Sequence, residues 1–265
     1  MTPQDISATF RQARSAGRAL QAYPGGTVPA DLGSAYAIQD MSIDAWPDKV
    51  AGWKVAMVQP AWRETYPAER VVGPVFGQAV WRAGREELDI PVIEGGYAAV
   101  EAEFAVRIAR TIALDAVFQD PSDLLPHIDG VHAAIELAGS PLASLSALGP
   151  GAVVSDFGNN AGLVIGPSMP LDLLSDPSSA LSESFVNGAS AGSGGAVKVP
   201  GGPLAAVMFL VAVLKKRGRT LNAGEWVSTG ATTGIHAVKP GDRVAAVFGE
   251  GVRIAARITA AGPQA

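Results

Sequence analysis

The 265-residue chain contains no cysteine, which excludes disulfides and thiolate metal sites. It also has no excess of basic residues: 20 Lys and Arg stand against 25 Asp and Glu, and the formal net charge is −5. A nucleic-acid partner is therefore not expected. Histidine metal sites are not indicated either, because His127, His132 and His236 lack the spacing typical of metal ligands.

Long apolar runs are missing as well. The longest, residues 204–214, is too short to cross a membrane, and the polar first 20 residues contain no apolar segment of a signal peptide. We therefore expect no membrane segment and predict a cytoplasmic location. Hydrophobic residues still make up 48% of the chain, which is enough to form a folded core.

Residues 1–48 are predicted to form a helical N-terminal region. Ile6, Phe10 and Ala13 recur at helical spacing, and a second helical pattern follows Asp31. The Gly- and Pro-containing segment YPGGTVPAD between the two patterns is predicted to be a loop. Its last residue, Asp31, is a candidate cap for the second helix.

Residues 49–265 are predicted to form a mixed-β core, so the fold class is α+β. Short apolar and β-branched runs alternate there with Gly and Pro, which is typical of strands and turns. Two helices are expected within this core, at residues 122–134 and 203–217. Asn187-Gly188 is predicted to be a hairpin turn, although its Ser- and Gly-rich surroundings also fit a mobile loop.

Three glutamates are candidate metal ligands. Glu101 and Glu103 alternate along a strand-like run, so both side chains point to one face. That face could simply be solvated, or the two carboxylates could bind a hard divalent cation. Glu136 is the only charged residue between His132 and Ser155, which predicts a buried carboxylate. Burial requires a partner, and an arginine, a backbone cap or a metal would each supply one.

Lys54 and Asp156 are candidate catalytic residues. Lys54 lies in the apolar run GWKVAM, where it could extend to the surface or, if buried near a bound acid, stabilise negative charge and move a proton. Asp156 precedes Asn159-Asn160 in a Gly-containing break between two apolar runs. Turn chemistry alone would explain these three residues.

Several segments, in this order, resemble the 2-keto-4-pentenoate hydratase and 4-oxalocrotonate decarboxylase family of the fumarylacetoacetate hydrolase superfamily. The resemblance covers nearly the whole chain, and it rests on ADLGSAYAIQD, GWKVAM, VEAEFAVRI, AAIELAGS, VSDFGNNAGLVIG, GGPLAAVMFL and STGATTGIHAVKPGDRV. It implies a fumarylacetoacetate-hydrolase-type core and a homo-oligomer, alone or with a related hydratase or decarboxylase subunit. It also implies Mg²⁺ or Mn²⁺ held by Glu101, Glu103 and Glu136, with Lys54 and Asp156 as catalytic residues.

The same resemblance implies substrate contacts at four positions: Val71, Phe157, Gly202 and Thr229. The chain departs from the family at three of them. Val71 stands in a stretch where the family carries an acid, Phe157 where it carries an asparagine, and Gly202 where it carries a histidine. These apolar replacements predict a pocket that accepts more hydrophobic substrate tails.

The activity that the resemblance implies is that of a metal-dependent lyase, a hydratase or decarboxylase. Its substrates would be small 2-hydroxydienoic or 2-oxo acids from the catabolism of aromatic-type compounds. The family's chemistry proceeds through a metal-stabilised enolate, which leads to hydration, decarboxylation or carbon–carbon cleavage. Two alternatives therefore stay open: a carbon–carbon hydrolase of acylpyruvate type, and a catalytically impaired partner subunit of a hydratase–decarboxylase complex.

Overall fold

The structure, a computed structural model, describes residues 1–84 and 86–262; residue 85 and residues 263–265 of the predicted core lie outside this range. The helices are α1 (Pro3–Ser15), α2 (Leu32–Asp44), α3 (Pro150–Ser155) and α4 (Gly202–Lys216). The strands are β1 (Val50–Met57), β2 (Arg70–Phe76), β3 (Val80–Arg82), β4 (Leu88–Val92), β5 (Tyr97–Ile108), β6 (Ile128–Ser140), β7 (Asn160–Met169), β8 (Leu181–Val186), β9 (Ala189–Gly195), β10 (Trp226–Ser228), β11 (His236–Ala237), β12 (Arg243–Phe248) and β13 (Val252–Ala260).

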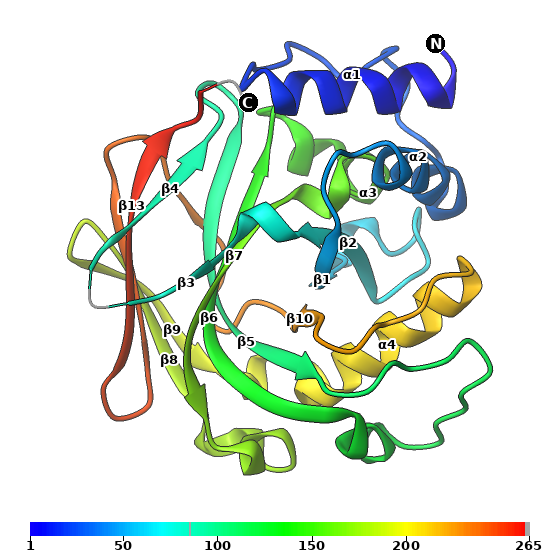
Figure 1. The fold of residues 1–265 in the computed structure, drawn as a ribbon. Helices are drawn as coiled ribbons and strands as arrows, with labels where there is room; N and C mark the ends of the chain where they lie inside the picture. The colour runs from blue at the N-terminus through cyan, green and yellow to red at the C-terminus, as the bar shows by residue number, and fades with distance from the viewer. Residues whose placement is uncertain (85, 263–265) are drawn as a thin grey trace.

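The predicted N-terminal helices are confirmed. Thr2 and Asp5 form a capping box that begins α1, and Asp31 begins α2 by accepting a hydrogen bond from the Ser34 amide. Ile6 and Phe10 of α1 are buried in a small core that also contains residues of the later chain, including Leu142 and Leu145. The helices α1, α2 and α3 lie close together at one end of the molecule (Figure 1). The predicted domain boundary at residue 48 stays a prediction.

Two mixed sheets form most of the rest of the molecule, which confirms the predicted α+β class. The larger sheet has the strand order β2-β1-β10-β5-β6-β7-β3, with β11 also paired to β5. The smaller sheet has the order β4-β13-β12-β8-β9 and lies beside the larger one (Figure 1). Most neighbours are antiparallel, but β1 runs parallel to β10, β3 to β7, and β4 to β13.

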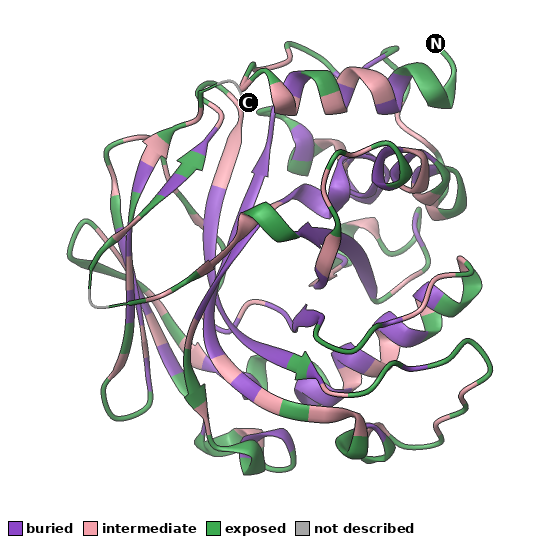
Figure 2. Ribbon diagram, viewed as in Figure 1, coloured by how far each residue is buried: buried purple, intermediate pink, exposed green. Residues whose placement is uncertain are grey.

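The long strands β5, β6 and β7 curve through the middle of the molecule, and much of their length is buried (Figure 2). The residues of β5 divide between its two faces. Val100, Ala102, Phe104 and Val106 belong to the main hydrophobic core, as the sequence alternation predicts. Glu101 and Glu103, on the opposite face of β5, are also buried, so that face is enclosed by protein rather than solvated.

The predicted helix at residues 122–134 is wrong. A short 3-10 helix covers Pro121–His127, and the strand β6 begins at Ile128. Two causes account for the difference. Pro126 interrupts helical hydrogen bonding, and β6 is buried on both faces from Ala133 onward, so its apolar run is continuous and carries no clear strand period.

The other local predictions are confirmed. Asn187 and Gly188 join β8 to β9 with φ angles of 52° and 81°, the left-handed pair that a tight hairpin turn requires. Helix α4 has Pro203 in its first turn, and Gly218 follows its end with a φ of 68°. Among the described residues, none of the helices has both the length and the apolar character needed to span a bilayer.

Candidate metal centre

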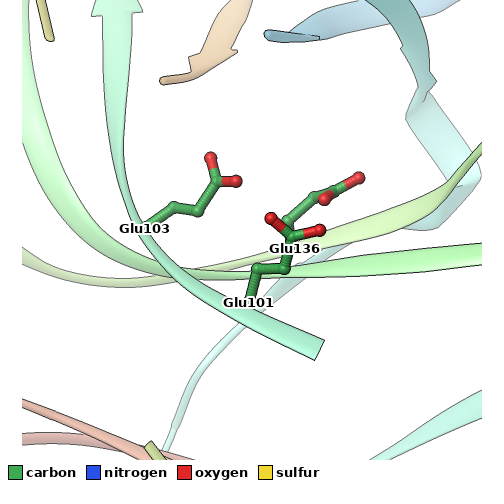
Figure 3. A group of neighbouring side chains, drawn as sticks. All are labelled: Glu101, Glu103 and Glu136. Carbon is green, nitrogen blue, oxygen red and sulfur yellow. The ribbon is translucent and has the colours of Figure 1, made fainter. Parts of the chain in front are cut away.

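Strand pairing brings the three predicted glutamates together. Glu101 lies directly opposite Glu136 in the antiparallel ladder of β5 and β6, and Glu103 lies opposite the small residue Ala134. Opposed residues share a face of the sheet, so all three carboxylates project to the same side. Figure 3 shows them pointing toward a common space, two from one strand and one from its neighbour.

The three carboxylates are close together and shielded from water. One oxygen atom from each lies within 4.8 Å of the others, and Glu101, Glu103 and Glu136 are 4%, 1% and 0% exposed. Burial, and then the Glu136 charge, raises the pKa of Glu101 to about 7. The same two causes, followed by the Glu101 charge, raise the pKa of Glu103 well above its usual value. Ionising all three therefore requires a compensating positive charge.

Hydrogen bonds fix two of the carboxylates and leave one fully buried oxygen atom, Glu136 Oε2, without a hydrogen bond from the described part of the chain. Glu103 Oε2 accepts bonds from the Ser228 hydroxyl at 2.5 Å and from the Gly230 amide at 2.8 Å. Glu136 Oε1 accepts from the side-chain amide of Asn160 at 2.8 Å. The other Glu136 oxygen, Oε2, is buried and accepts no hydrogen bond from the described residues. A hard divalent cation fits this donor set, because it prefers carboxylate oxygens and would coordinate Glu136 Oε2.

Lys54 supplies the positive charge nearest to the carboxylates. It pairs with Ser228 across β1 and β10, and Ser228 pairs with Ala105 of β5, so Lys54 lies on the glutamate face. Its ammonium nitrogen is 3.4 Å from Glu136 Oε2 and donates to Asn159 Oδ1 at 2.9 Å. Burial lowers the pKa of Lys54, but the three carboxylates outweigh burial and raise it overall. The surrounding carboxylates therefore favour the charged form of Lys54.

A cavity of about 310 Å³ opens beside Lys54 and Glu101. The polar side chains of Lys54, Glu101 and Asn159 line one part of it, and apolar side chains form much of the remaining wall: Met57, Val58, Trp62, Val71, Val153 and Ile235. Among the described lining residues, Lys54 is the only cation. The cavity thus combines a charged end, suited to a small acid, with an apolar wall suited to a carbon chain.

A strained turn brings Asn159 and Asn160 to the site. Phe157, Gly158 and Asn159 have φ angles of 55°, 63° and 58°, three left-handed residues in succession. This conformation costs an L-residue with a side chain about 1–2 kcal/mol. The turn packs so closely on β2 that a Cβ on Gly73 would lie 2.1 Å from the Phe157 carbonyl oxygen. Only glycine fits there.

The structure does not bring Asp156 to the cavity. Its carboxylate is 1% exposed and accepts bonds from Arg14 at 2.6 and 3.0 Å and from the Ser140 hydroxyl at 2.6 Å. Both oxygen atoms are therefore occupied by fixed donors, and the side chain does not line the cavity. The structure therefore places Asp156 in a structural position beside the turn, and its predicted catalytic role stays a prediction.

Of the four predicted substrate contacts, only Val71 lines the cavity. Phe157 packs edge-on against Trp46 and Phe76, on the opposite side of the turn. Gly202 opens α4 with a φ of 78°, a conformation that favours glycine, and it does not line the cavity. The Thr229 hydroxyl donates to the Phe104 carbonyl at 2.8 Å, because Thr229 points to the opposite face from Ser228.

Four contributors to the site were missed from the sequence: Asn159, Asn160, Ser228 and Gly230. Turn chemistry alone is enough to explain the first two from the sequence. The position of Asn160 as the first residue of a buried strand nevertheless indicates a hydrogen-bond partner, since a buried side-chain amide needs one. Ser228 and Gly230 flank the predicted Thr229. Ser228 lies on the same face of the sheet as Lys54 because the two residues are paired across β1 and β10, and the sequence alone does not reveal that pairing.

No model of a protein family matches the chain. Among solved structures it is similar to 4-oxalocrotonate decarboxylase from Pseudomonas putida G7, complexed with magnesium and adipate, with a TM-score of 0.80, 20% identity and 97% of each chain covered. It is also similar to fumarylpyruvate hydrolase from Pseudomonas aeruginosa in complex with Mn²⁺ and pyruvate, with a TM-score of 0.57, 19% identity, and 81% of this chain and 91% of that chain covered. A third similar structure is 2-hydroxyhepta-2,4-diene-1,7-dioate isomerase from Mycobacterium marinum, with a TM-score of 0.57, 18% identity, and 81% and 77% covered. The chain therefore shares the fold of these structures, in agreement with the fold that the sequence resemblance predicted.

Proposed function

We propose that the chain is a metal-dependent enzyme that acts on 2-oxo or 2-hydroxydienoic acids as a lyase, either a hydratase or a decarboxylase. The observation that carries the proposal is the cluster of three buried carboxylates with ligand atoms within 4.8 Å, beside a lysine and a cavity. The likeness to a decarboxylase complexed with magnesium and to a hydrolase in complex with Mn²⁺ and pyruvate supports a metal-dependent enzyme and fits both the lyase and the hydrolase alternative.

Glu101, Glu103 and Glu136 are the residues that would hold Mg²⁺ or Mn²⁺. When bound, such an ion supplies Lewis acidity toward the carboxylate and 2-oxo oxygens of a substrate. The residues themselves fit this role, because ionising all three carboxylates would place more negative charge there than Lys54 alone can balance. Ser228 and Asn160 orient two of the three carboxylates, as hydrogen-bond partners of metal ligands commonly do.

Lys54 is the residue placed to act on the substrate. Its ammonium group is held by Asn159 and Glu136 and borders the cavity. From there, it attracts an anionic substrate and stabilises negative charge that develops on it. The Nζ atom can also donate a proton to the developing enolate, a transfer that hydration and decarboxylation both require.

The apolar wall sets the expected substrate tail. Val71, Val153 and Ile235 offer contact to carbon but no hydrogen bond or charge to a distal carboxylate. Burying an unpaired carboxylate against such a wall is costly. The wall therefore favours substrates with one carboxylate and an uncharged tail, and it keeps bulk water from the charged end of the cavity.

A substrate panel tests the proposal and separates it from its alternatives. Purified protein with Mg²⁺ or Mn²⁺ is offered 2-hydroxydienoates, oxalocrotonate-like diacids and acylpyruvates, and ultraviolet absorbance and product masses are followed. Addition of water indicates a hydratase, loss of carbon dioxide a decarboxylase, and two acid products the acylpyruvate-type hydrolase. Metal binding without turnover of any substrate would contradict the enzyme proposal and favour a non-catalytic partner subunit.

A further inference from the structure

The turn at residues 157–159 has a functional position but an unfavourable backbone. Its three left-handed residues direct Asn159 Oδ1 to the Lys54 ammonium at 2.9 Å. The next side chain, Asn160, donates to Glu136 at 2.8 Å. Both amides therefore depend on a conformation that residues with side chains rarely adopt, and surrounding contacts must hold the turn in it.

Arg14 of α1 provides many of those contacts. Its guanidinium group donates to the Asp156 carboxylate at 2.6 and 3.0 Å and to the Asp156 carbonyl at 3.2 Å. It also donates to the Asn160 carbonyl at 3.0 Å and to the Gly139 carbonyl of β6 at 2.9 Å. One side chain thus joins both ends of the turn to the strand that carries Glu136.

Two further contacts complete the attachment. Asp156 accepts a bond from Ser140, at the end of β6, and the Arg14 guanidinium lies 5.1 Å from the centre of the Phe157 ring. The Arg14 side chain is only 9% exposed, and that of Asp156 is fully buried, so water competes little for their ion pair. A planar guanidinium suits this position, because it donates in several fixed directions at once.

We infer that Arg14 and Asp156 are positioning residues: their ion pair holds the left-handed turn, and the turn holds Asn159 on Lys54 and Asn160 on Glu136. The N-terminal helix α1 thereby acts on the metal centre without touching it. The catalytic consequence rests on the proposed function of Lys54 and Glu136, whereas the holding of the turn does not.

The test compares Arg14→Ala with the wild type and with Arg18→Ala, a change of an exposed arginine just beyond the end of α1. Hydrogen–deuterium exchange of peptides covering residues 156–162 reports on the turn without any metal. Calorimetric titration with Mn²⁺ reports on the glutamates. We expect faster exchange confined to this segment and Mn²⁺ binding weakened by about 10- to 100-fold, as for other partners that orient ligands. Arg18→Ala should match the wild type in both.

Guanidinium chloride at millimolar concentration separates positioning from general destabilisation. A guanidinium ion that fills the site left by Arg14→Ala should partly restore protection and Mn²⁺ affinity, whereas a merely destabilised protein would lose more of both. If Arg14→Ala does not fold, Arg14→Lys replaces it. Lysine keeps a charge beside Asp156 but cannot reach both carbonyl groups, so a smaller change of the same kind is expected.

Unchanged exchange at residues 156–162, or faster exchange spread evenly over the chain, would overturn the inference. A wild type that shows the protected turn but binds no Mn²⁺ would instead contradict the proposed function, and the exchange data would still decide on the turn. A variant with a loosened turn and unchanged Mn²⁺ affinity and turnover would also overturn the positioning role.

Discussion

Glu101 and Glu136 lie directly opposite each other in the antiparallel ladder of β5 and β6, and both carboxylates are buried on the same face of the sheet. Two buried negative charges this close repel each other strongly unless a positive charge lies between them. Lys54 offers one such charge, but Glu103 adds a third carboxylate. Ionising all three carboxylates would therefore leave an excess of negative charge that only a further cation can balance.

Ser228→Ala should weaken Mn²⁺ binding without unfolding the protein. The hydroxyl orients Glu103, and loss of such a partner costs about 10- to 100-fold in metal affinity. The matched control is Ser184→Ala, which also removes a buried serine hydroxyl but lies in the smaller sheet. Calorimetric titration of both variants is the measurement. Equal affinity in Ser228→Ala and Ser184→Ala would argue against a role for this hydroxyl in the site.

Lys54→Met should lower turnover by about 10²- to 10⁴-fold, the usual contribution of an acid–base group, while Mn²⁺ still binds. Methionine keeps most of the bulk but cannot carry charge or donate a proton. Steady-state kinetics with saturating Mn²⁺ is the measurement, and Lys216→Met, at an exposed position on α4, is the control. Full activity, or a protein that melts even with Mn²⁺ bound, would mean that Lys54 is not catalytic.

The stabilising effect of Mn²⁺ should grow with pH. Burial, followed by the Glu136 charge, raises the pKa of Glu101 from 4.5 to about 7. The unfolded chain releases this proton earlier, so the metal-free protein loses free energy of unfolding as the pH rises from about 4.5 through about 7. Mn²⁺ binds the ionised carboxylate and offsets that loss. Thermal melting with and without Mn²⁺ should show a larger difference in Tm at about pH 8 than at about pH 6; an equal difference would contradict the argument.

The cavity should discriminate against a second carboxylate. The enzyme should therefore prefer a 2-oxo acid with an apolar tail over a diacid of similar length. Gln59 is exposed and lines the cavity, so Gln59→Arg adds a cation there without burying one. It should raise kcat/KM for the diacid by about two- to fivefold, the effect of one exposed ion pair. Gln59→Met is the uncharged control, and a wild type that prefers the diacid would refute the prediction.

Much of the metal cluster could be predicted from the sequence because strand alternation is a local property. The spacing of Glu101 and Glu103 fixes their common face whatever the neighbouring strands are. The isolation of Glu136 in an apolar run likewise signals burial. Which strands lie side by side is not local, so the pairing that sets Glu101 opposite Glu136 came only with the structure.

The errors have equally specific causes. The strand β6 is buried on both faces over much of its length, so its apolar run lacks the alternation that separates strand from helix. A phenylalanine in the left-handed region, as at Phe157, is not predictable from residue preferences. That turn brings Asn159 and Asn160 to Lys54 and Glu136 and directs Asp156 toward Arg14 instead. For this reason the two amides, and not the predicted aspartate, lie at the site.

Calorimetric titration with Mn²⁺ tests the central claim most directly. Wild-type protein should bind one ion. Glu101→Gln, Glu103→Gln and Glu136→Gln should each lower the Mn²⁺ affinity by more than roughly 100-fold, which is the most that loss of an orienting hydrogen-bond partner costs. Glu225→Gln is the matched control, because Glu225 is also buried but accepts its bonds from Trp53 and Asn222. It should bind Mn²⁺ like the wild type. A wild type that binds no Mn²⁺, or three cluster variants with unchanged affinity, would contradict the assignment of this cluster as a metal centre.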